Sequence, residues 1–229
     1  MSSGSTPRAV TCDNPSVIWS AADIADAIEA GLQRRRDADD LEQAVYGFDA
    51  LDELGLHPIL FDALGAVGWG VWPEQTYPSD EGKRRKSEGK RCDCVLTRRG
   101  LPLRDREVRG TVFDTIEAED PADAYWLEIK TVAQHETSGP FRRYSAELLN
   151  PVQKDVRKLW SDGVIRHAGL LLVLFTENHE VAEHDLAAWH DRCLRKGLPI
   201  GSPAVRGFPI VDRIGNAWCS TAVFGVRGC

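Results

Sequence analysis

The amino-acid sequence predicts a mixed α/β (α+β) fold, in which a central mixed β-sheet is flanked by helices. Helical patterns come first along the chain, a run of strand patterns follows, and helix and strand patterns then alternate. The segment "GLLLVLF" at 169–175 is a continuous apolar run of the kind found in strands that are buried on both faces of a sheet. With 42% hydrophobic and 28% charged residues, the 229-residue chain has enough apolar material for a packed core.

The N-terminal part of the chain is predicted to be helical. Ser20 is placed to cap a helix over 21–36, in which apolar residues recur at helical spacing. A second helical stretch is expected over 40–54. Pro58 suits the first turn of a third helix, because proline has no amide hydrogen to lose there.

Strand patterns occupy the middle of the chain. Strands are expected over 68–78, 91–98, 111–119 and 125–132, and a polar loop or hairpin tip over 79–90 joins the first two.

The C-terminal part alternates between helix and strand. Asn150 and Pro151 are predicted to start a helix, with Asn150 as the capping residue. A buried strand over 168–176, a helix over 180–194 and a last strand over 216–226 are expected to follow.

The segment "YWLEIKTV" at 125–132 places two charges in a strand that is otherwise apolar. Side chains alternate along a strand, so Glu128 and Lys130 project from the same face. Asp93 is a similar anomaly in the apolar strand "CDCVL", where it is expected to share a face with Val95. Charges are costly in a core unless they are paired, bound to metal or exposed at a site. Two carboxylates and a lysine at adjacent strand ends would form an oxygen-ligand site for a hard divalent cation.

A purely structural alternative is an ion-pair ladder that includes Glu128 and Lys130 on a half-exposed edge strand. The tripeptide Glu-x-Lys is weak evidence by itself, because it also occurs at 81–83 and 88–90 within the polar loop. Only the copy at 128–130 interrupts an apolar strand.

An acid in one strand and Glu-x-Lys in the next resemble the motif of the PD-(D/E)XK nuclease superfamily, which has the restriction-endonuclease-like fold. The order of elements is similar as well, with "GWGVWPEQTYP", "RCDCVL" and "YWLEIK" as core strands before the basic helix "NPVQKDVRKLW" and the strand "GLLLVLF". The resemblance covers about residues 45–178. The proline that usually precedes the first acid of the motif is absent, because Arg91 and Cys92 precede Asp93.

The resemblance implies metal-dependent hydrolysis of phosphodiester bonds. Asp93 and Glu128 would hold Mg²⁺, for which Mn²⁺ could substitute, together with the backbone carbonyl of Ile129. Lys130 would position or help to deprotonate the attacking water, or neutralise charge in the transition state. Further site residues implied by the resemblance are Glu53, with Glu42 and Glu74 as alternatives, and Gln134.

The net charge of −7 is unevenly distributed. Segment 83–109 holds eleven basic and four acidic residues, a charge of +7, which leaves −14 for the rest of the chain. The basic residues of this segment lie on both sides of Asp93 in the sequence, and a basic face is expected on the helix after Pro151. Such residues could bind nucleic-acid phosphates with little dependence on sequence, although a charged run is also typical of a solvated surface. The residues predicted to contact nucleic acid are Arg84, Arg85, Lys90, Arg91, Lys154, Arg157 and Lys158.

The length suits a single domain over 17–229 after a flexible N-terminus at 1–16. Its nuclease-like core would span about 45–178, preceded by a helical part at 17–55 and completed by a helix and strand within 179–229. No apolar run approaches the roughly 20 residues of a membrane span, and the chain start lacks the pattern of a secretion signal, so a cytoplasmic protein is expected. The six cysteines are expected to be reduced, without a zinc site.

The predicted function is therefore that of a Mg²⁺-dependent nuclease acting on DNA, with RNA as the other candidate substrate. A bacterial role in defence, restriction or repair follows by analogy, and cutting both strands would favour a homodimer. Two alternatives stay open. One is a catalytically inactive protein of the same fold that binds nucleic acid or a protein partner, and the other is a metal-dependent hydrolase of nucleotides or other phosphoesters.

Overall fold

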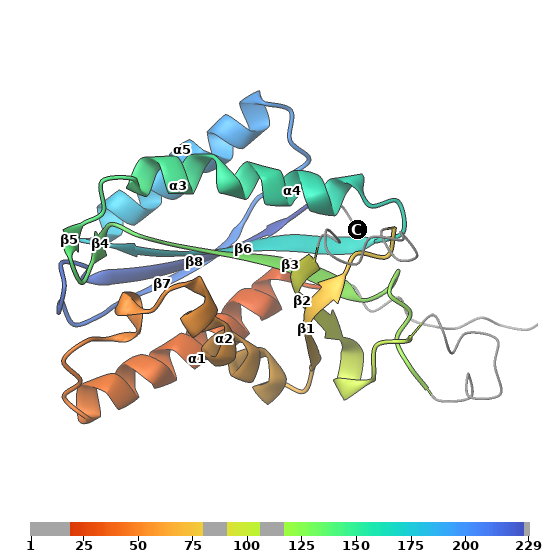
Figure 1. Ribbon diagram of the computed structural model, residues 1–229, viewed down its shortest axis with the longest axis horizontal. Coiled ribbons are helices and arrows are strands. Elements are labelled where there is room, and N and C mark those ends of the chain that lie inside the picture. Colours follow the sequence, from red (N-terminus) through yellow and green to blue (C-terminus); the bar gives the residue numbers. More distant parts are fainter. Residues whose placement is uncertain (1–18, 80–90, 106–116, 227–229) are drawn as a thin grey trace, which may run out of the picture.

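The computed structural model describes residues 19–79, 91–105 and 117–226, and its centre is a six-stranded mixed sheet with helices on both faces (Figure 1). This is the predicted fold class. The strand order is β1-β2-β3-β6-β8-β7, with β3 and β6 parallel and the other neighbours antiparallel. The strands of this sheet are β1 (Gly70–Thr76), β2 (Arg91–Thr97), β3 (Tyr125–Ala133), β6 (His167–Thr176), β7 (Ala204–Pro209) and β8 (Trp218–Gly225). The helices are α1 (Ala21–Leu41), α2 (Glu53–Ala66), α3 (Tyr144–Leu149), α4 (Pro151–Ser161) and α5 (His179–Arg195), with short 3-10 helices η1 (Phe48–Ala50) and η2 (Arg98–Gly100).

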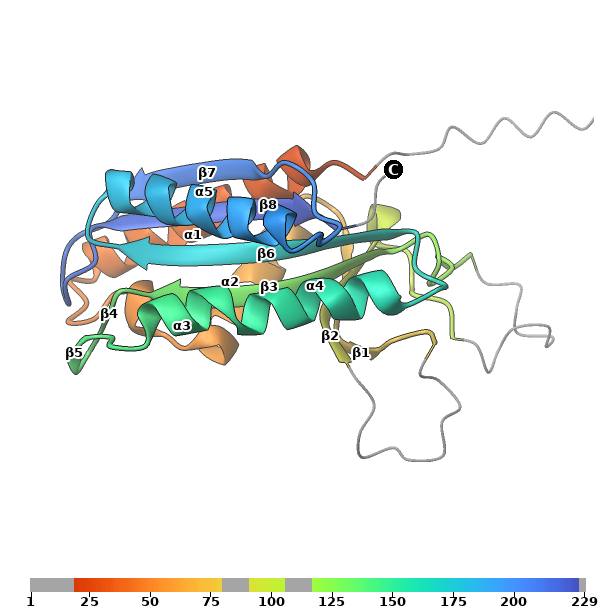
Figure 2. The same cartoon turned by 90° about the horizontal axis from the view of Figure 1, so that it is seen from above.

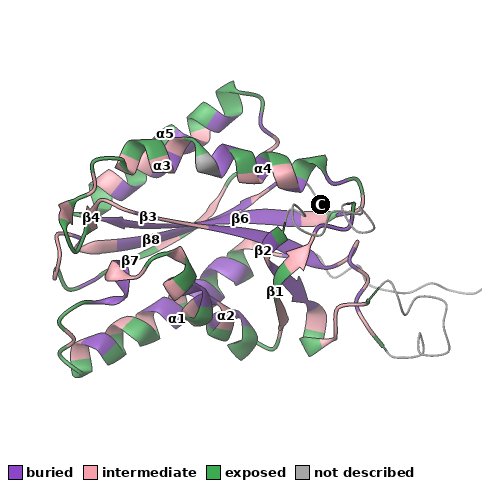
Figure 3. Ribbon diagram, in the orientation of Figure 1, coloured by how far each residue is buried: buried purple, intermediate pink, exposed green. Residues whose placement is uncertain are grey.

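The sheet separates two apolar clusters. Helices α1 and α2 cover one face, and α3, α4 and α5 cover the other (Figures 1 and 2). The central strands are the most deeply buried part of the molecule (Figure 3), and every residue of β6 after His167 is buried, as its continuous apolar sequence predicts. No described helix is long and apolar enough to cross a membrane.

Several predicted elements are confirmed with small shifts at their ends. Ser20 caps α1, because its hydroxyl accepts a hydrogen bond from the amide of Asp23 at 3.2 Å. The four cysteines in the described part of the chain, Cys92, Cys94, Cys193 and Cys219, are buried free thiols. The strand predicted over 111–119 lies mostly outside the described residues, as do the N-terminus at 1–16, Cys12 and Cys229.

The prediction of a helix over 40–54 is wrong. Helix α1 continues to Leu41, and the chain then turns back, because the Asp39 carboxylate accepts the amide of Phe48 at 2.9 Å. Helix α2 begins at Glu53, where Asp52 caps the amide of Gly55 at 2.8 Å. Pro58 therefore lies inside α2 rather than in its first turn.

The C-terminal half contains elements that the pattern did not predict. These additional elements are strand β7, helix α3 and a small hairpin formed by β4 (His135–Glu136) and β5 (Gly139–Pro140). Asn150 does not cap α4 with its side chain, because it adopts helical backbone angles between α3 and α4.

Helices α1 and α2 approach closely at Gly31. A β-carbon at this position would lie 2.2 Å from Cβ of Ala63, so only glycine allows this contact. We expect Gly31→Ala to lower the free energy of unfolding by about 2 kcal/mol through overpacking, measured by denaturant titration. The double variant Gly31→Ala/Ala63→Gly should recover most of this loss. If Gly31→Ala alone is as stable as the native chain, the contact is looser than described.

Candidate active site at the open edge of strand β3

Strand β2 pairs with β3 over only part of its length. The register runs from Leu96 opposite Tyr125 to Cys94 opposite Leu127, although β3 continues to Ala133 beside β6. Figure 1 shows β1 and β2 running at a steep angle to the other strands. After Leu127, no described strand pairs with β3 on this side.

The regular alternation of side chains in β2 breaks at Asp93. Cys92 packs in the core cluster beneath α4 and α5 together with Val95, whereas Cys94 packs in the cluster beneath α1 and α2. Residues two apart in a regular strand share a face, so the strand is irregular between Cys92 and Cys94, and the common face of Asp93 and Val95 stays a prediction. Opposite, Glu74 of β1 has a left-handed backbone with φ of 54°, which is uncommon for a non-glycine residue.

Carboxylates take the place of the missing strand along the open edge of β3. Oδ2 of Asp93 accepts the amide of Ile129 at 2.7 Å. Oε2 of Glu53, from the first residue of α2, accepts the amide of Thr131 at 3.2 Å. Unpaired backbone amides in a partly buried site are costly, so these bonds stabilise the edge and fix both carboxylates beside the strand.

Lys130 pairs with Glu53 at this edge. Its Nζ lies 2.9 Å from Oε2 of Glu53, and both side chains are partly exposed. Burial alone would lower the pKa of Lys130, but the hydrogen bond and charge of Glu53, with Asp155 and Glu147, raise it above its ordinary value. Lys130 is therefore an ammonium at neutral pH. Glu53, predicted from the resemblance, is thus placed beside Lys130.

Glu128 is the most deeply buried charged group of the site, with 2% of its surface exposed. Its Oε1 accepts a hydrogen bond from the hydroxyl of Tyr77 and lies 3.6 Å from Nζ of Lys158. Lys158 also pairs with Asp155 one helical turn earlier on α4, at 2.7 Å. Lys158, predicted to bind phosphate from the helix surface, instead faces the carboxylates.

Burial raises the pKa of Glu128 well above its ordinary value, and the nearby charge of Asp93 raises it further. Lys158 and Tyr77 act in the opposite direction and do not offset these effects. Two carboxylates are therefore held close together with too little positive charge around them. This is the arrangement that a bound cation would relieve.

The raised pKa of Glu128 predicts a pH-dependent loss of stability without metal. At a pH below the ordinary pKa of a glutamate, Glu128 is neutral in both the folded and the unfolded protein. Above that pH the unfolded protein loses this proton more readily than the folded protein does, so the free energy of unfolding falls as the pH rises. Glu128→Gln removes this loss. In chelator, we expect the free energy of unfolding of the variant to rise relative to that of the native chain as the pH increases above the ordinary pKa of a glutamate. A pH-independent difference for Glu128→Gln would contradict the expectation.

The ion-pair ladder that was the structural alternative for Glu128 and Lys130 is not seen among the described residues. The two side chains lie beyond the last residue of β3 that pairs with β2, but Lys130 pairs with Glu53 and Glu128 lies near Lys158. Gln134 is placed elsewhere, because its Oε1 accepts the amide of Glu177 at 2.8 Å. It is not joined to the carboxylates by this contact, so the structure does not support its predicted role.

The predicted nucleic-acid contacts divide into three groups, of which Lys158, near Glu128, forms one. Arg84, Arg85 and Lys90 lie outside the described residues. Arg91 at the start of β2 and Lys154 and Arg157 on α4 are exposed. Arg98, another base of segment 83–109, is used internally, since its Nε donates to Oε1 of the buried Glu119 at 2.7 Å.

The donor set suits a hard divalent cation. The described cluster holds four carboxylates and two ammonium groups, Lys130 and Lys158. Full ionisation would thus give it a charge of −2, equal in size to that of one such cation. No group of three or more His, Cys, Asp or Glu in the described chain is arranged to hold a metal. Mg²⁺ is commonly held by one or two carboxylates and keeps several waters, so a pair such as Asp93 and Glu128 would be enough protein ligands for it.

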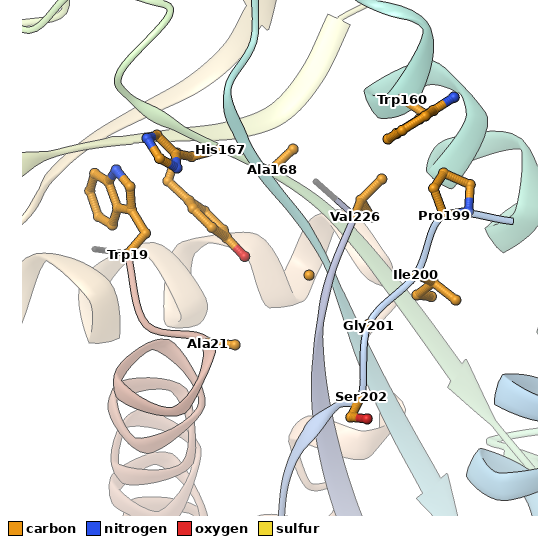
Figure 4. A pocket seen from close by; sticks show the side chains of 12 residues that line it. Trp19, Ala21, Trp160, His167, Ala168, Pro199, Ile200, Gly201, Ser202 and Val226 are labelled. Atoms are coloured by element: carbon orange, nitrogen blue, oxygen red, sulfur yellow. The ribbon is translucent and has the colours of Figure 1, made fainter. Parts of the chain in front are cut away.

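Two cavities among the described residues have linings that do not include these carboxylates. One, of about 460 Å³, lies at the start of β3 and β6, where Trp19, Trp160 and His167 border it (Figure 4). The other, of about 640 Å³, lies between α5 and strands β7 and β8. The candidate site lies at the edge of β3 that β2 leaves unpaired.

Comparisons of the chain with protein-family models, with curated proteins and with solved structures found no match.

Proposed function

We propose that the chain is a Mg²⁺-dependent nuclease of the PD-(D/E)XK type that hydrolyses phosphodiester bonds of DNA. The observation that supports this best is the convergence of Asp93, Glu128 and Lys130 where β2 separates from β3. Short and degenerate sequence motifs gain weight when their residues come from neighbouring strands and face one another. Glu53 adds a second acid at the same edge.

Asp93 and Glu128 would hold the metal ion, with the carbonyl of Ile129 as a further ligand. A bound Mg²⁺ would supply an activated water and stabilise the charge that develops on the phosphate oxygens. The two carboxylates are already positioned for this, since Asp93 is fixed by the amide of Ile129 and Glu128 by Tyr77 and Lys158.

Lys130 would act as an electrostatic group rather than as a base. A general base must be able to accept a proton, and the raised pKa of Lys130 keeps its ammonium protonated at neutral pH. Its role would be to hold the attacking water or to stabilise negative charge on the phosphate in the transition state. Glu53 would orient it through the 2.9 Å ion pair. Of the roles left open by the sequence, proton abstraction is therefore disfavoured.

Exposed bases near the site would bind the DNA backbone. Arg91 begins the strand that carries Asp93, and Lys154 and Arg157 lie on the helix that carries Lys158. Phosphate contacts of this kind give salt-dependent binding that is largely independent of sequence. A role in defence, restriction or repair would be consistent with such binding.

A substrate panel tests the proposal directly. Purified protein with Mg²⁺ or Mn²⁺ is incubated with supercoiled plasmid, single-stranded DNA, RNA and free nucleotides, and chelator is added in parallel. Cleavage of DNA that chelator abolishes is the expected result, and linear plasmid formed without a nicked intermediate would point to a dimer with two sites. Hydrolysis confined to nucleotides would favour the other phosphoester hydrolase. Metal-independent DNA binding without cleavage would favour the inactive binding protein.

A further inference from the structure

Tyr77 lies against the back of the candidate metal site. It is the residue immediately after β1 and is buried, with its ring stacked on Trp126 of β3 at a centroid distance of 5.6 Å and an interplanar angle of 25°. Its hydroxyl donates to Oε1 of Glu128. A buried tyrosine hydroxyl needs a partner, and here that partner is the carboxylate of the site.

Two side chains from separate segments approach that one oxygen. Oε1 of Glu128 accepts from Tyr77 and faces Nζ of Lys158 on α4 at 3.6 Å. The hydrogen bond and the ion pair that Glu128 makes with the described residues both involve Oε1. The protein thus fixes one oxygen of Glu128, and Oε2 would be the oxygen presented to a ligand.

The segment that carries Tyr77 is anchored to the end of α4. The amide of Ser79 donates to Oδ2 of Asp162 at 2.9 Å, while Oδ1 of Asp162 accepts the amide of Val164 at 2.9 Å. Burial alone would raise the pKa of Asp162, but the hydrogen bonds from Ser79 and from Val164 lower it below the ordinary value. The carboxylate therefore stays ionised and locks residues 77–79 against the helix that also supplies Lys158.

We propose that Tyr77 is a positioning residue of the metal site: it holds Oε1 of Glu128 so that Oε2 is presented, beside Asp93, to the divalent cation. The inference rests on the proposed function, because it concerns the same site. Carboxylate ligands are commonly oriented by hydrogen bonds of this kind, and losing one typically weakens metal binding by about tenfold to hundredfold.

The test is calorimetric titration of Mn²⁺ into the native full-length chain and into Tyr77→Phe, which keeps the ring and its stacking on Trp126. Tyr144→Phe is the matched control, since the hydroxyl of Tyr144 donates to Oδ2 of Asp185 at 2.8 Å, between α3 and α5. We expect Tyr77→Phe to bind Mn²⁺ about tenfold to hundredfold more weakly, with Tyr144→Phe unchanged. Asp162→Ala, which removes the acceptor of the Ser79 amide while keeping Tyr77, should weaken binding to a smaller extent.

Three outcomes separate the possibilities. Equal Mn²⁺ affinity of Tyr77→Phe and the native chain would overturn the positioning role while leaving the metal site intact. An equal loss in Tyr77→Phe and Tyr144→Phe would also overturn it, because the effect would then come from general destabilisation. Absence of Mn²⁺ binding by both the native chain and Tyr144→Phe would overturn the proposed metal site itself.

Discussion

Asp93→Asn is expected to reduce Mg²⁺-dependent DNA cleavage by at least about a thousandfold, because a catalytic metal supplies several kcal/mol of transition-state stabilisation. The substitution removes one of the two carboxylates that would hold the ion. It keeps a side-chain oxygen that can accept the amide of Ile129, so the open edge of β3 should stay intact. Cleavage rates at saturating DNA and Mn²⁺ titration measure the two effects separately.

Glu74→Gln is the control for this experiment. Glu74 is an exposed acid on the neighbouring strand β1 and was an alternative candidate from the sequence. Its replacement should leave cleavage within about twofold of the native rate, as expected for a surface change away from the ligands. If Asp93→Asn cleaves as well as Glu74→Gln, Asp93 is not a metal ligand and the site has been assigned wrongly.

Lys130→Met should lower the turnover rate by about a hundredfold to a thousandfold, the usual effect of removing one preorganised group that stabilises transition-state charge. Mn²⁺ affinity should be retained, because the lysine is not a ligand. The pH profile of the native enzyme should show no limb from deprotonation of Lys130 near neutral pH, since Glu53 keeps its pKa above the ordinary value.

Lys154→Met provides the comparison for Lys130, because Lys154 is an exposed lysine on α4. It should weaken DNA binding slightly and reduce its salt dependence, with turnover of bound DNA preserved. Full turnover in Lys130→Met would show that the ammonium has no part in the reaction, even if the carboxylates bind metal.

The alternation of side chains was sufficient to predict that Glu128 and Lys130 share a face, and the apolar context distinguished them from the two other Glu-x-Lys tripeptides. The composition and order of apolar segments also predicted the central strands, because β3 and β6 are buried on both faces. These features depend on local periodicity, which a sequence contains directly.

Long-range contacts could not be predicted in the same way. Tyr77 has no signal that marks it as a partner of Glu128, which lies 51 positions away, and the contact exists because β1 and β3 place the two side chains in one core. Asp155 and Lys158 are spaced as an ion pair on one helix face, so that pair could have been predicted and would have shown that Lys158 is not simply a surface base.

The errors in element boundaries have local causes. Capping of Gly55 by Asp52 starts α2 before Pro58, and the amide of Phe48 bonds to the Asp39 side chain instead of continuing α1. Side-chain to backbone bonds of this kind compete with helix propensity and are not visible in hydrophobic spacing. The irregularity of β2 at Asp93 also has a local cause, because the pairing of β2 with β3 ends at Cys94, the residue next to Asp93.

Anomalous diffraction from a crystal of the protein soaked in Mn²⁺ would locate the ion. We predict an anomalous difference peak between the carboxylates of Asp93 and Glu128, at the edge of β3 that β2 leaves open, and no such peak in crystals of Asp93→Asn. A Mn²⁺-saturated crystal with no peak there, or with the ion bound elsewhere, would contradict it.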